Sequence, residues 1–331
     1  MQYKSVKGYS SLAQFGILLL FIFIGFILAA IAQFIISIKM LPGGISEKNL
    51  EEAIMKAMLD PKNIGLARLA QVLGTFLLLF VPAVLYSWVV NGKNKFWLGF
   101  NKFLNPYQVL LGFIIIFAAN IMAAPIADFT KDIVANFPSL DVMAKKMEQV
   151  YNEQVMALSN LRSWPEFLMA IVIMAFFPAL FEEIFFRGAM QNLLVHWIGK
   201  PIIAIIITSL LFSLIHMSIY LFLSRAILGF VLGLMYHKTK NIWVNVIAHF
   251  LNNAIAVAQL FWMSSRDEKI DLDKLDPKIE WWIGLLALVA LVFLFRWLKK
   301  YSVINKEKIL ATEAQLYAKS NVHDPFIQSE V

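Results

Sequence analysis

The sequence predicts an all-α, polytopic membrane protein with about eight transmembrane helices and a polar cavity among the later spans. Three observations lead to this prediction. Of the 331 residues, 60% are hydrophobic and 15% are charged, whereas a soluble domain is roughly 45–50% apolar. The apolar residues are gathered in runs long enough to cross about 30 Å of hydrocarbon as helices. The ionisable residues that we single out within these runs all lie in the second half of the chain.

The first apolar run covers residues 13–38 and contains no charged side chain. It is longer than the apolar core of a cleaved secretory signal, which has about 7–15 residues, so we interpret it as a retained first span. Residues 202–236 are expected to form two short helices, or one re-entrant unit broken near Ser218 or Ser224. The further spans are predicted at 67–90, 109–127, 167–187, 202–217, 221–236, 242–263 and 281–298.

Two polar segments between the runs have the spacing of amphipathic helices. In residues 45–60, Leu50, Ile54 and Met58 lie four residues apart, and residues 142–158 show a looser stripe of the same kind. We expect both helices to pack on the membrane surface or on neighbouring loops.

The composition excludes several classes of function. The chain has no cysteine, which excludes disulfides, thiolate catalysis and cysteine-ligated zinc. Its net charge of +7 is explained by lysines beside the spans, so no nucleic-acid partner is expected. The lipid bilayer is the expected environment of this multi-pass protein. The lysine bias places both termini in the cytoplasm, which makes the plasma (inner) membrane the expected location in a bacterium.

The fourth predicted span carries three charged residues, Glu182, Glu183 and Arg187. On a helix, Glu183 and Arg187 are one turn apart and share a face, whereas Glu182 lies about 100° round the axis. Because one arginine neutralises only one carboxylate well, Glu182 is the candidate for general acid–base catalysis. The alternative is that the span ends near Phe181 and all three charges lie among the lipid headgroups.

Later spans add two histidines and an asparagine. His216 lies near the end of the apolar run 202–217, where a single histidine is more often structural than catalytic. Asn245, His249 and Asn253 recur every four residues, so they line one face of a helix. This stripe suits hydrogen bonds between helices, or donors that stabilise a developing oxyanion. Together these side chains could activate one water and hydrolyse an amide in a buried site.

Three motifs occur in a defined order: EExxxR at Glu182, Glu183 and Arg187, FxxxH at Phe212 and His216, and HxxxN at His249 and Asn253. In these motifs the chain resembles the CPBP family of intramembrane glutamic endopeptidases, the CAAX protease and bacteriocin-processing enzymes also named the Abi family. The resemblance covers about residues 171–256, and the ordered set is more specific than any single motif.

This resemblance implies a water-accessible cavity enclosed by the later spans. By analogy, Glu182 with His216 would activate the water, and His249 with Asn253 would form the oxyanion hole. Glu183, Arg187 and Phe212 would be supporting residues. No cofactor or metal is implied, and the substrate would be a membrane protein or a peptide.

We expect three regions along the chain: N-terminal transmembrane helices with amphipathic connections in 1–164, a CPBP-like catalytic core in 165–300, and a polar C-terminal tail in 301–331.

Two other readings stay open. His216, His249 and a glutamate could ligate a catalytic zinc, although the chain has no HExxH motif. The protein could also be a non-catalytic membrane scaffold or immunity protein that keeps the polar residues for packing.

The predicted spans raise one geometric difficulty. If the fifth span begins on the side of Glu182, His216 would lie about 20 Å away at 1.5 Å per residue. Contact would require the fourth span to run on through 191–197 and the fifth to extend past Met217.

Overall fold

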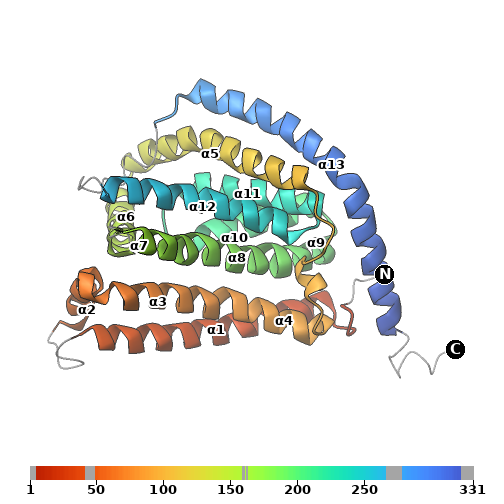
Figure 1. Cartoon of the computed structure of the whole chain (residues 1–331), viewed down its shortest axis with the longest axis horizontal. Coiled ribbons are helices and arrows are strands. Elements are labelled where there is room, and N and C mark those ends of the chain that lie inside the picture. The colour runs from red at the N-terminus through yellow and green to blue at the C-terminus, as the bar shows by residue number, and fades with distance from the viewer. Residues whose placement is uncertain (1–4, 42–48, 159–160, 162, 266–277, 322–331) are drawn as a thin grey trace.

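The computed structural model describes residues 5–41, 49–158, 161, 163–265 and 278–321. Every regular element in this part of the chain is a helix (Figure 1). The predicted all-α fold is therefore confirmed.

Among the described residues, six helical stretches are long and apolar enough to cross a membrane. A helix satisfies all its backbone hydrogen bonds internally, which is what a chain in hydrocarbon requires. The protein is thus a multi-pass integral membrane protein. The six stretches are α1 (Ser11–Met40), Pro61–Asn91, α5 (Pro106–Ala135), Trp164–Ile198, α12 (Ile242–Ser264) and α13 (Trp281–Asn321).

Two of these stretches combine several helical segments end to end. The first is made of a 3-10 turn η2 (Pro61–Asn63), α3 (Ile64–Thr75), π-helix η3 (Phe76–Phe80) and α4 (Val81–Asn91). The second is made of α7 (Trp164–Ala170), π-helix η5 (Ile171–Phe176), α8 (Phe177–Glu183), π-helix η6 (Ile184–Gln191) and α9 (Asn192–Ile198).

Residues 202–236 form two short helices, one of the two arrangements expected for them. They are α10 (Pro201–Leu214) and α11 (Phe222–Thr239), and neither is among the six long apolar stretches. The count of eight spans is therefore not confirmed.

Local sequence explains where the helices that hold the site begin and turn. Ser163 and Glu166 form a capping box at the start of α7. Asn241 accepts a hydrogen bond from the N–H of Trp243 at the start of α12. Gly199, in the left-handed region with φ +70°, ends α9, and Pro201 begins α10. Trp164–Ile198 and α10 consequently form a tight antiparallel hairpin.

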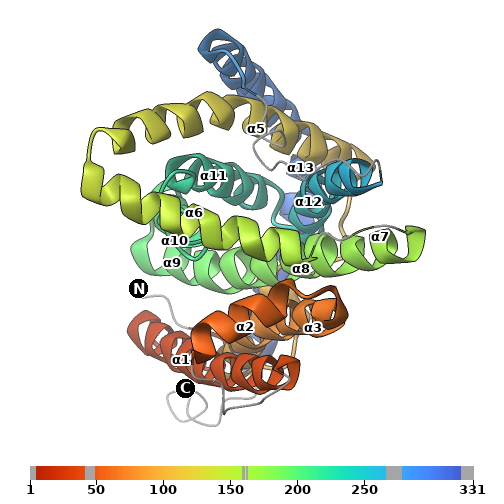
Figure 2. The ribbon, with the colours of Figure 1, turned by 90° about the vertical axis from the view of Figure 1, so that its left-hand side faces the viewer.

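Two amphipathic helices cover one end of the bundle. Figure 2 shows α2 (Leu50–Leu59) and α6 (Pro138–Leu158) lying across the ends of the longer helices. They correspond to the amphipathic helices predicted at 45–60 and 142–158, which are confirmed, although residues 45–48 lie outside the described residues.

The opposite end gathers the residues before α1 and the connections between α4 and α5, between α9 and α10, and between α11 and α12. The backbone N–H of Lys7 donates to the carbonyl of Val90 at 3.1 Å, and Ile242 donates to Gly99 at 3.0 Å. Lysines 7, 93, 95, 102, 200, 238 and 240 belong to these connections and the helix ends beside them. We name this end of the bundle the lysine end.

The last helix is longer than the sequence indicated. Residues 301–321, predicted to be a polar tail, continue α13, which curves round the lysine end in Figure 1. Its polar part is fixed to the bundle, since Gln108 Nε2 donates to Ser302 Oγ at 3.0 Å. Residues 322–331 lie outside the described residues.

Candidate active site

The antiparallel hairpin places Glu182 opposite His216. Both residues lie 17 positions from Gly199 at the turn, roughly 25 Å along each helical arm of the hairpin at 1.5 Å per residue. Glu182 Oε2 is 4.0 Å from His216 Nε2. The alternative in which the fourth span ends near Phe181 is wrong, because Glu182, Glu183 and Arg187 are buried within a continuous helical stretch.

The geometric difficulty is resolved differently from our expectation. The fourth stretch does continue, to Ile198, but α10 ends at Leu214 instead of extending past Met217. His216 lies in the connection after α10, next to Met217, whose φ of +50° is uncommon for a residue other than glycine. The chain therefore turns back at the point where the histidine meets the glutamate.

Two contacts hold His216 in this connection. Its Nδ1 lies 2.7 Å from the carbonyl of Phe212, one turn earlier. Its own carbonyl accepts a hydrogen bond of 3.3 Å from Arg225 Nη1, and the Arg225 guanidinium lies 5.0 Å above the Tyr151 ring of α6. The imidazole orientation thus depends on α10, α11 and α6.

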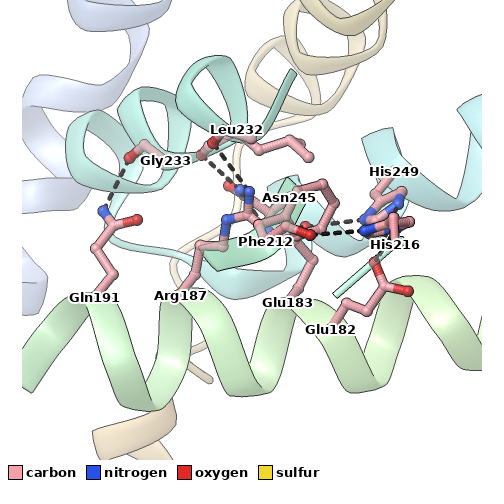
Figure 3. A network of polar contacts seen from close by, with 11 residues as sticks. Glu182, Glu183, Arg187, Gln191, Phe212, His216, Leu232, Gly233, Asn245 and His249 are labelled. Carbon is pink, nitrogen blue, oxygen red and sulfur yellow. Dashed lines mark hydrogen bonds and ion pairs between the residues drawn. The ribbon is translucent and has the colours of Figure 1, made fainter. Parts of the chain in front are cut away.

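Glu183 lies at the centre of a buried polar network (Figure 3). Its Oε1 is 2.8 Å from Arg187 Nη1 and 2.9 Å from His249 Nδ1. Its Oε2 accepts a hydrogen bond of 3.1 Å from Asn245 Nδ2. The one-turn ion pair predicted between Glu183 and Arg187 is therefore confirmed. Glu183 and Arg187 are 0% and 2% exposed, so each charge depends on this network.

Arg187 and Gln191 attach this helix to α11. Arg187 Nη2 donates to the carbonyl of Gly229 at 3.0 Å, and Gln191 Nε2 donates to that of Gly233 at 3.0 Å. Residues 187 and 191 are one helical turn apart, and so are residues 229 and 233, so the two donors match the two carbonyls in spacing. We did not predict Gln191 or these carbonyls, although the matched spacing was a signal for them.

Local helix geometry was also not predicted. Arg187 and Gln191 lie in the π-helix η6, which follows directly on Glu183. Such π-helical segments are rare and frequently occur at functional sites. The sequence shows no feature from which we could have derived it.

Glu182 has different surroundings from its neighbour. The residue is 8% exposed, and its Oε2 is buried without a hydrogen-bond partner among the described residues. The same oxygen lies 4.0 Å from His216 Nε2 and 3.8 Å from His249 Nε2. Two imidazoles and one free carboxylate oxygen therefore face a common point.

The hydrogen bonds assign protons to the histidines. A backbone carbonyl and a carboxylate only accept, so Nδ1 is the donor in both His216 and His249. In a neutral histidine the other ring nitrogen then carries a lone pair. Nε2 of each neutral ring would present an acceptor toward Glu182.

The predicted stripe on α12 has mixed surroundings. Asn245 and His249 contact Glu183, whereas Asn252 accepts a hydrogen bond of 2.5 Å from Asn120 of α5 and so links two helices. Asn253 follows His249 by one turn on the same face and is partly buried. Within the described residues, no hydrogen bond joins its side chain to the other site residues. The structure thus brings together Glu182, Glu183, Arg187, Phe212, His216 and His249.

Phe212 supports the site through its ring. The Arg187 guanidinium lies 4.9 Å from the ring centroid, and the His216 ring lies 4.8 Å from it. A cation over an aromatic face is stabilised by the ring quadrupole. Phe212 therefore packs between the buried ion pair and His216.

Within the described part of the chain, no group of three or more His, Asp or Glu side chains is arranged to hold a metal ion.

One comparison with known proteins concerns the same region. Residues 164–255 match the family described as type II CAAX prenyl endopeptidase Rce1-like, and all three motifs lie within this match. The uncharacterized protein YpbD of Bacillus subtilis (strain 168) is 31% identical over 123 residues, which cover 36% of this chain and 56% of that protein. No solved structure matches the chain.

Proposed function

We propose that the chain is an intramembrane endopeptidase that uses a water activated by Glu182 and His216. The match of residues 164–255 to the family described as type II CAAX prenyl endopeptidase Rce1-like supports this proposal. One observation carries this proposal. Glu182 Oε2 is buried, has no hydrogen-bond partner in the described part of the chain, and faces the Nε2 atoms of His216 and His249.

Water activation follows from the acceptors at this point. A water held between Glu182 Oε2 and His216 Nε2 would donate one O–H to each, leaving its oxygen lone pairs directed at a peptide carbonyl. On attack, the water oxygen bonds to the carbonyl carbon and one proton passes to Glu182. The C–N bond then breaks, and this proton passes to the leaving amine.

His249 and Asn253 are proposed to stabilise the oxyanion of the tetrahedral intermediate. Since Nδ1 of His249 already donates to Glu183, donation from Nε2 requires the doubly protonated ring. The proposal therefore assigns the imidazolium form to His249 before the water attacks, so that this ring takes up no proton in the step. The Asn253 amide, one turn further along α12, would supply the second donor.

Glu183 and Arg187 are proposed to act as positioning residues. Glu183 fixes the His249 ring, and Arg187 compensates the buried carboxylate while it holds α11 through Gly229. The proposed substrate is a membrane protein or peptide, and the proposed location in a bacterium is the plasma membrane.

The test compares membrane proteomes of cells that express the wild type or Glu182→Ala. We expect at least one membrane protein to accumulate uncleaved in the variant. A peptide that contains its cleavage site then serves as the substrate in vitro. Glu182→Ala and His216→Ala should each lower the cleavage rate by at least about 100-fold, the contribution of a general base. Full activity in the Glu182 variant, with the same cleavage site, would contradict the proposal.

A zinc-dependent mechanism is the second candidate, because the carboxylate–imidazole pair of Glu183 and His249 is also found behind zinc ligands. Purified protein should keep its activity in a chelator and should contain no stoichiometric metal if our proposal is right. Activity that is lost to the chelator and restored by zinc would favour the metal mechanism.

If the protein is a non-catalytic scaffold instead, site substitutions would change a cellular phenotype only in proportion to the decrease in the amount of folded protein.

A further inference from the structure

A groove opens at the lysine end, away from the Glu182 site. It has a volume of about 620 Å³ and is lined by residues of the connection 94–103, by Trp243 in the first turn of α12, and by Thr312 and Leu316 of α13. This volume lies within the range of about 300–1,000 Å³ that is usual for small-molecule sites.

Specific contacts hold the walls of this groove. Asn101 Nδ2 donates to the carbonyl of Lys240 at 2.9 Å, and Asn241 Nδ2 donates to Asn101 Oδ1 at 3.0 Å. On the other side, the Tyr317 ring of α13 packs on the Trp97 ring at 4.9 Å. The connection and α13 are thus fixed to the bundle on both sides of the groove.

The rim of the groove is positively charged and its walls are aromatic. Lys95 and Lys102 are exposed, and within the described residues neither forms an ion pair with a carboxylate. Phe100, Phe103 and Trp243 line the groove, with the Phe100 and Trp243 rings 5.3 Å apart. Two uncompensated ammonium groups beside an apolar wall suit a ligand with an anionic head and an apolar body.

The position of the groove along the spans narrows the choice of ligand. The candidate span α5 begins at Pro106, shortly after the groove residues of the connection 94–103, and the candidate span α12 begins at Ile242, next to Trp243 of the groove. The groove therefore lies where two spans emerge from the hydrocarbon, the depth at which headgroups are found. Basic pockets of this kind between helices favour anionic headgroups.

We propose that this groove binds the headgroup of an anionic glycerophospholipid. Lys95 and Lys102 contact the phosphate oxygens, while the aromatic wall packs on the glycerol and the first methylene groups. A soluble phosphate would share the charged contacts but would leave the aromatic wall exposed to water. A zwitterionic phospholipid carries a cationic group in its headgroup, which the two lysines would repel.

Native mass spectrometry of the full chain, titrated with phosphatidylglycerol or phosphatidylcholine, tests this proposal. We expect the wild type to prefer phosphatidylglycerol. Lys95→Gln/Lys102→Gln should weaken phosphatidylglycerol binding by roughly 25-fold, because each lysine near an anionic surface contributes roughly fivefold. The matched control is Lys200→Gln/Lys300→Gln, which removes the same charge at the same end and should keep the preference.

Two results would overturn the proposal. One is equal loss of the lipid preference in both double variants, which would indicate a general charge effect rather than a site. The other is displacement of the lipid by an equal concentration of glycerol phosphate, which would indicate a site for soluble phosphate. Cleavage by the Glu182 site does not enter this measurement, so the result is independent of the proposed function.

Discussion

At the residue scale, two adjacent glutamates in one helix have opposite surroundings. Glu183 accepts from Arg187, Asn245 and His249, so its charge is fully compensated. Glu182 Oε2 has no such partner among the described residues and faces two histidines. A carboxylate that accepts three hydrogen bonds and is paired with an arginine is a poor base, because these contacts stabilise its ionised form. The proposed mechanism therefore assigns the proton transfer to Glu182.

Substitution by glutamine should separate these two roles. Glu182→Gln should lower the cleavage rate by at least about 100-fold and change the unfolding free energy little. Glu183→Gln should destabilise the protein by about 3–5 kcal/mol, because it leaves the Arg187 charge buried without its partner. Cleavage assays and unfolding measurements on both variants check this.

A double variant provides the control for the Glu183 effect. Glu183→Gln/Arg187→Met removes both charges and should recover part of the stability lost in the single variant. If Glu182→Gln were the more destabilised single variant, the assignment of the two carboxylates would be reversed.

At the element scale, the approach of α11 to its neighbours depends on its glycines. A Cβ at Gly233 would lie 2.7 Å from Ile205 Cγ2 and 3.0 Å from Gln191 Oε1. A Cβ at Gly16 of α1 would have nothing within 4 Å. The GxxxG spacing of Gly229 and Gly233 therefore allows α11 to pack closely against α10 and the Trp164–Ile198 stretch.

Alanine at Gly233 and alanine at Gly16 should therefore have different effects on the stability of the protein. Gly233→Ala should destabilise the protein by about 1–3 kcal/mol through overpacking. Gly16→Ala should be neutral or stabilising by up to about 1 kcal/mol, because alanine is the better helix former. Unfolding midpoints of the two variants measure the difference. Equal unfolding midpoints for the two variants would show that α11 can shift away from α10 without a loss of stability.

The connection after α10 is the second element-scale feature. Besides the Arg225 contact, Ser218 Oγ donates to Glu148 Oε2 at 3.2 Å, and Tyr220 Oη donates to Asp141 Oδ1 at 2.6 Å. Both acceptors belong to α6. Burial and the Asp141 carboxylate raise the pKa of Tyr220 to about 12. The phenol therefore remains a donor throughout the physiological range, and α6 stays attached to the connection that carries His216.

Arg225 should act on catalysis through His216. Arg225→Ala removes the hydrogen bond to the His216 carbonyl and the contact with Tyr151, so kcat should fall about tenfold with little change in KM. Arg225→Lys should restore part of the rate. Arg296→Ala, which removes an exposed arginine of α13, is the control. A change in KM alone would assign Arg225 to substrate binding instead.

At the scale of the whole molecule, the two ends of the bundle differ in composition. The connections at the lysine end carry lysines and no acidic residue, whereas the other end, covered by α2 and α6, carries lysines interleaved with aspartates and glutamates. Positively charged connections stay on the cytoplasmic side of a membrane. The lysine end should therefore face the cytoplasm, and α6 should face the opposite side.

The absence of native cysteine makes this topology directly measurable. Lys200→Cys at the lysine end and Lys146→Cys on α6 are both at exposed positions. In intact cells, a membrane-impermeant maleimide should label Lys146→Cys and should label Lys200→Cys only after permeabilisation. The reverse pattern would invert the topology.

Much of the candidate site was predictable because its signals are local. Charged and polar side chains within apolar runs stand out at single positions, and one-turn spacing is enough to pair Glu183 with Arg187. The position of His216 was less predictable. Its contact with Glu182 depends on where α10 ends, and an apolar run marks a helix end poorly when the following residues are also apolar.

The sequence by itself determined the membrane class, the helical fold, the amphipathic helices and the identity of the polar residues, since each follows from composition and short-range periodicity. Only the tertiary structure decided which carboxylate is compensated by three partners, which carbonyls receive Arg187 and Gln191, and how far α13 continues. These features depend on contacts between segments more than 40 residues apart, such as Arg187 with Gly229, a separation of 42 residues. Local patterns do not encode the relative placement of such segments, because packing of whole helices sets it.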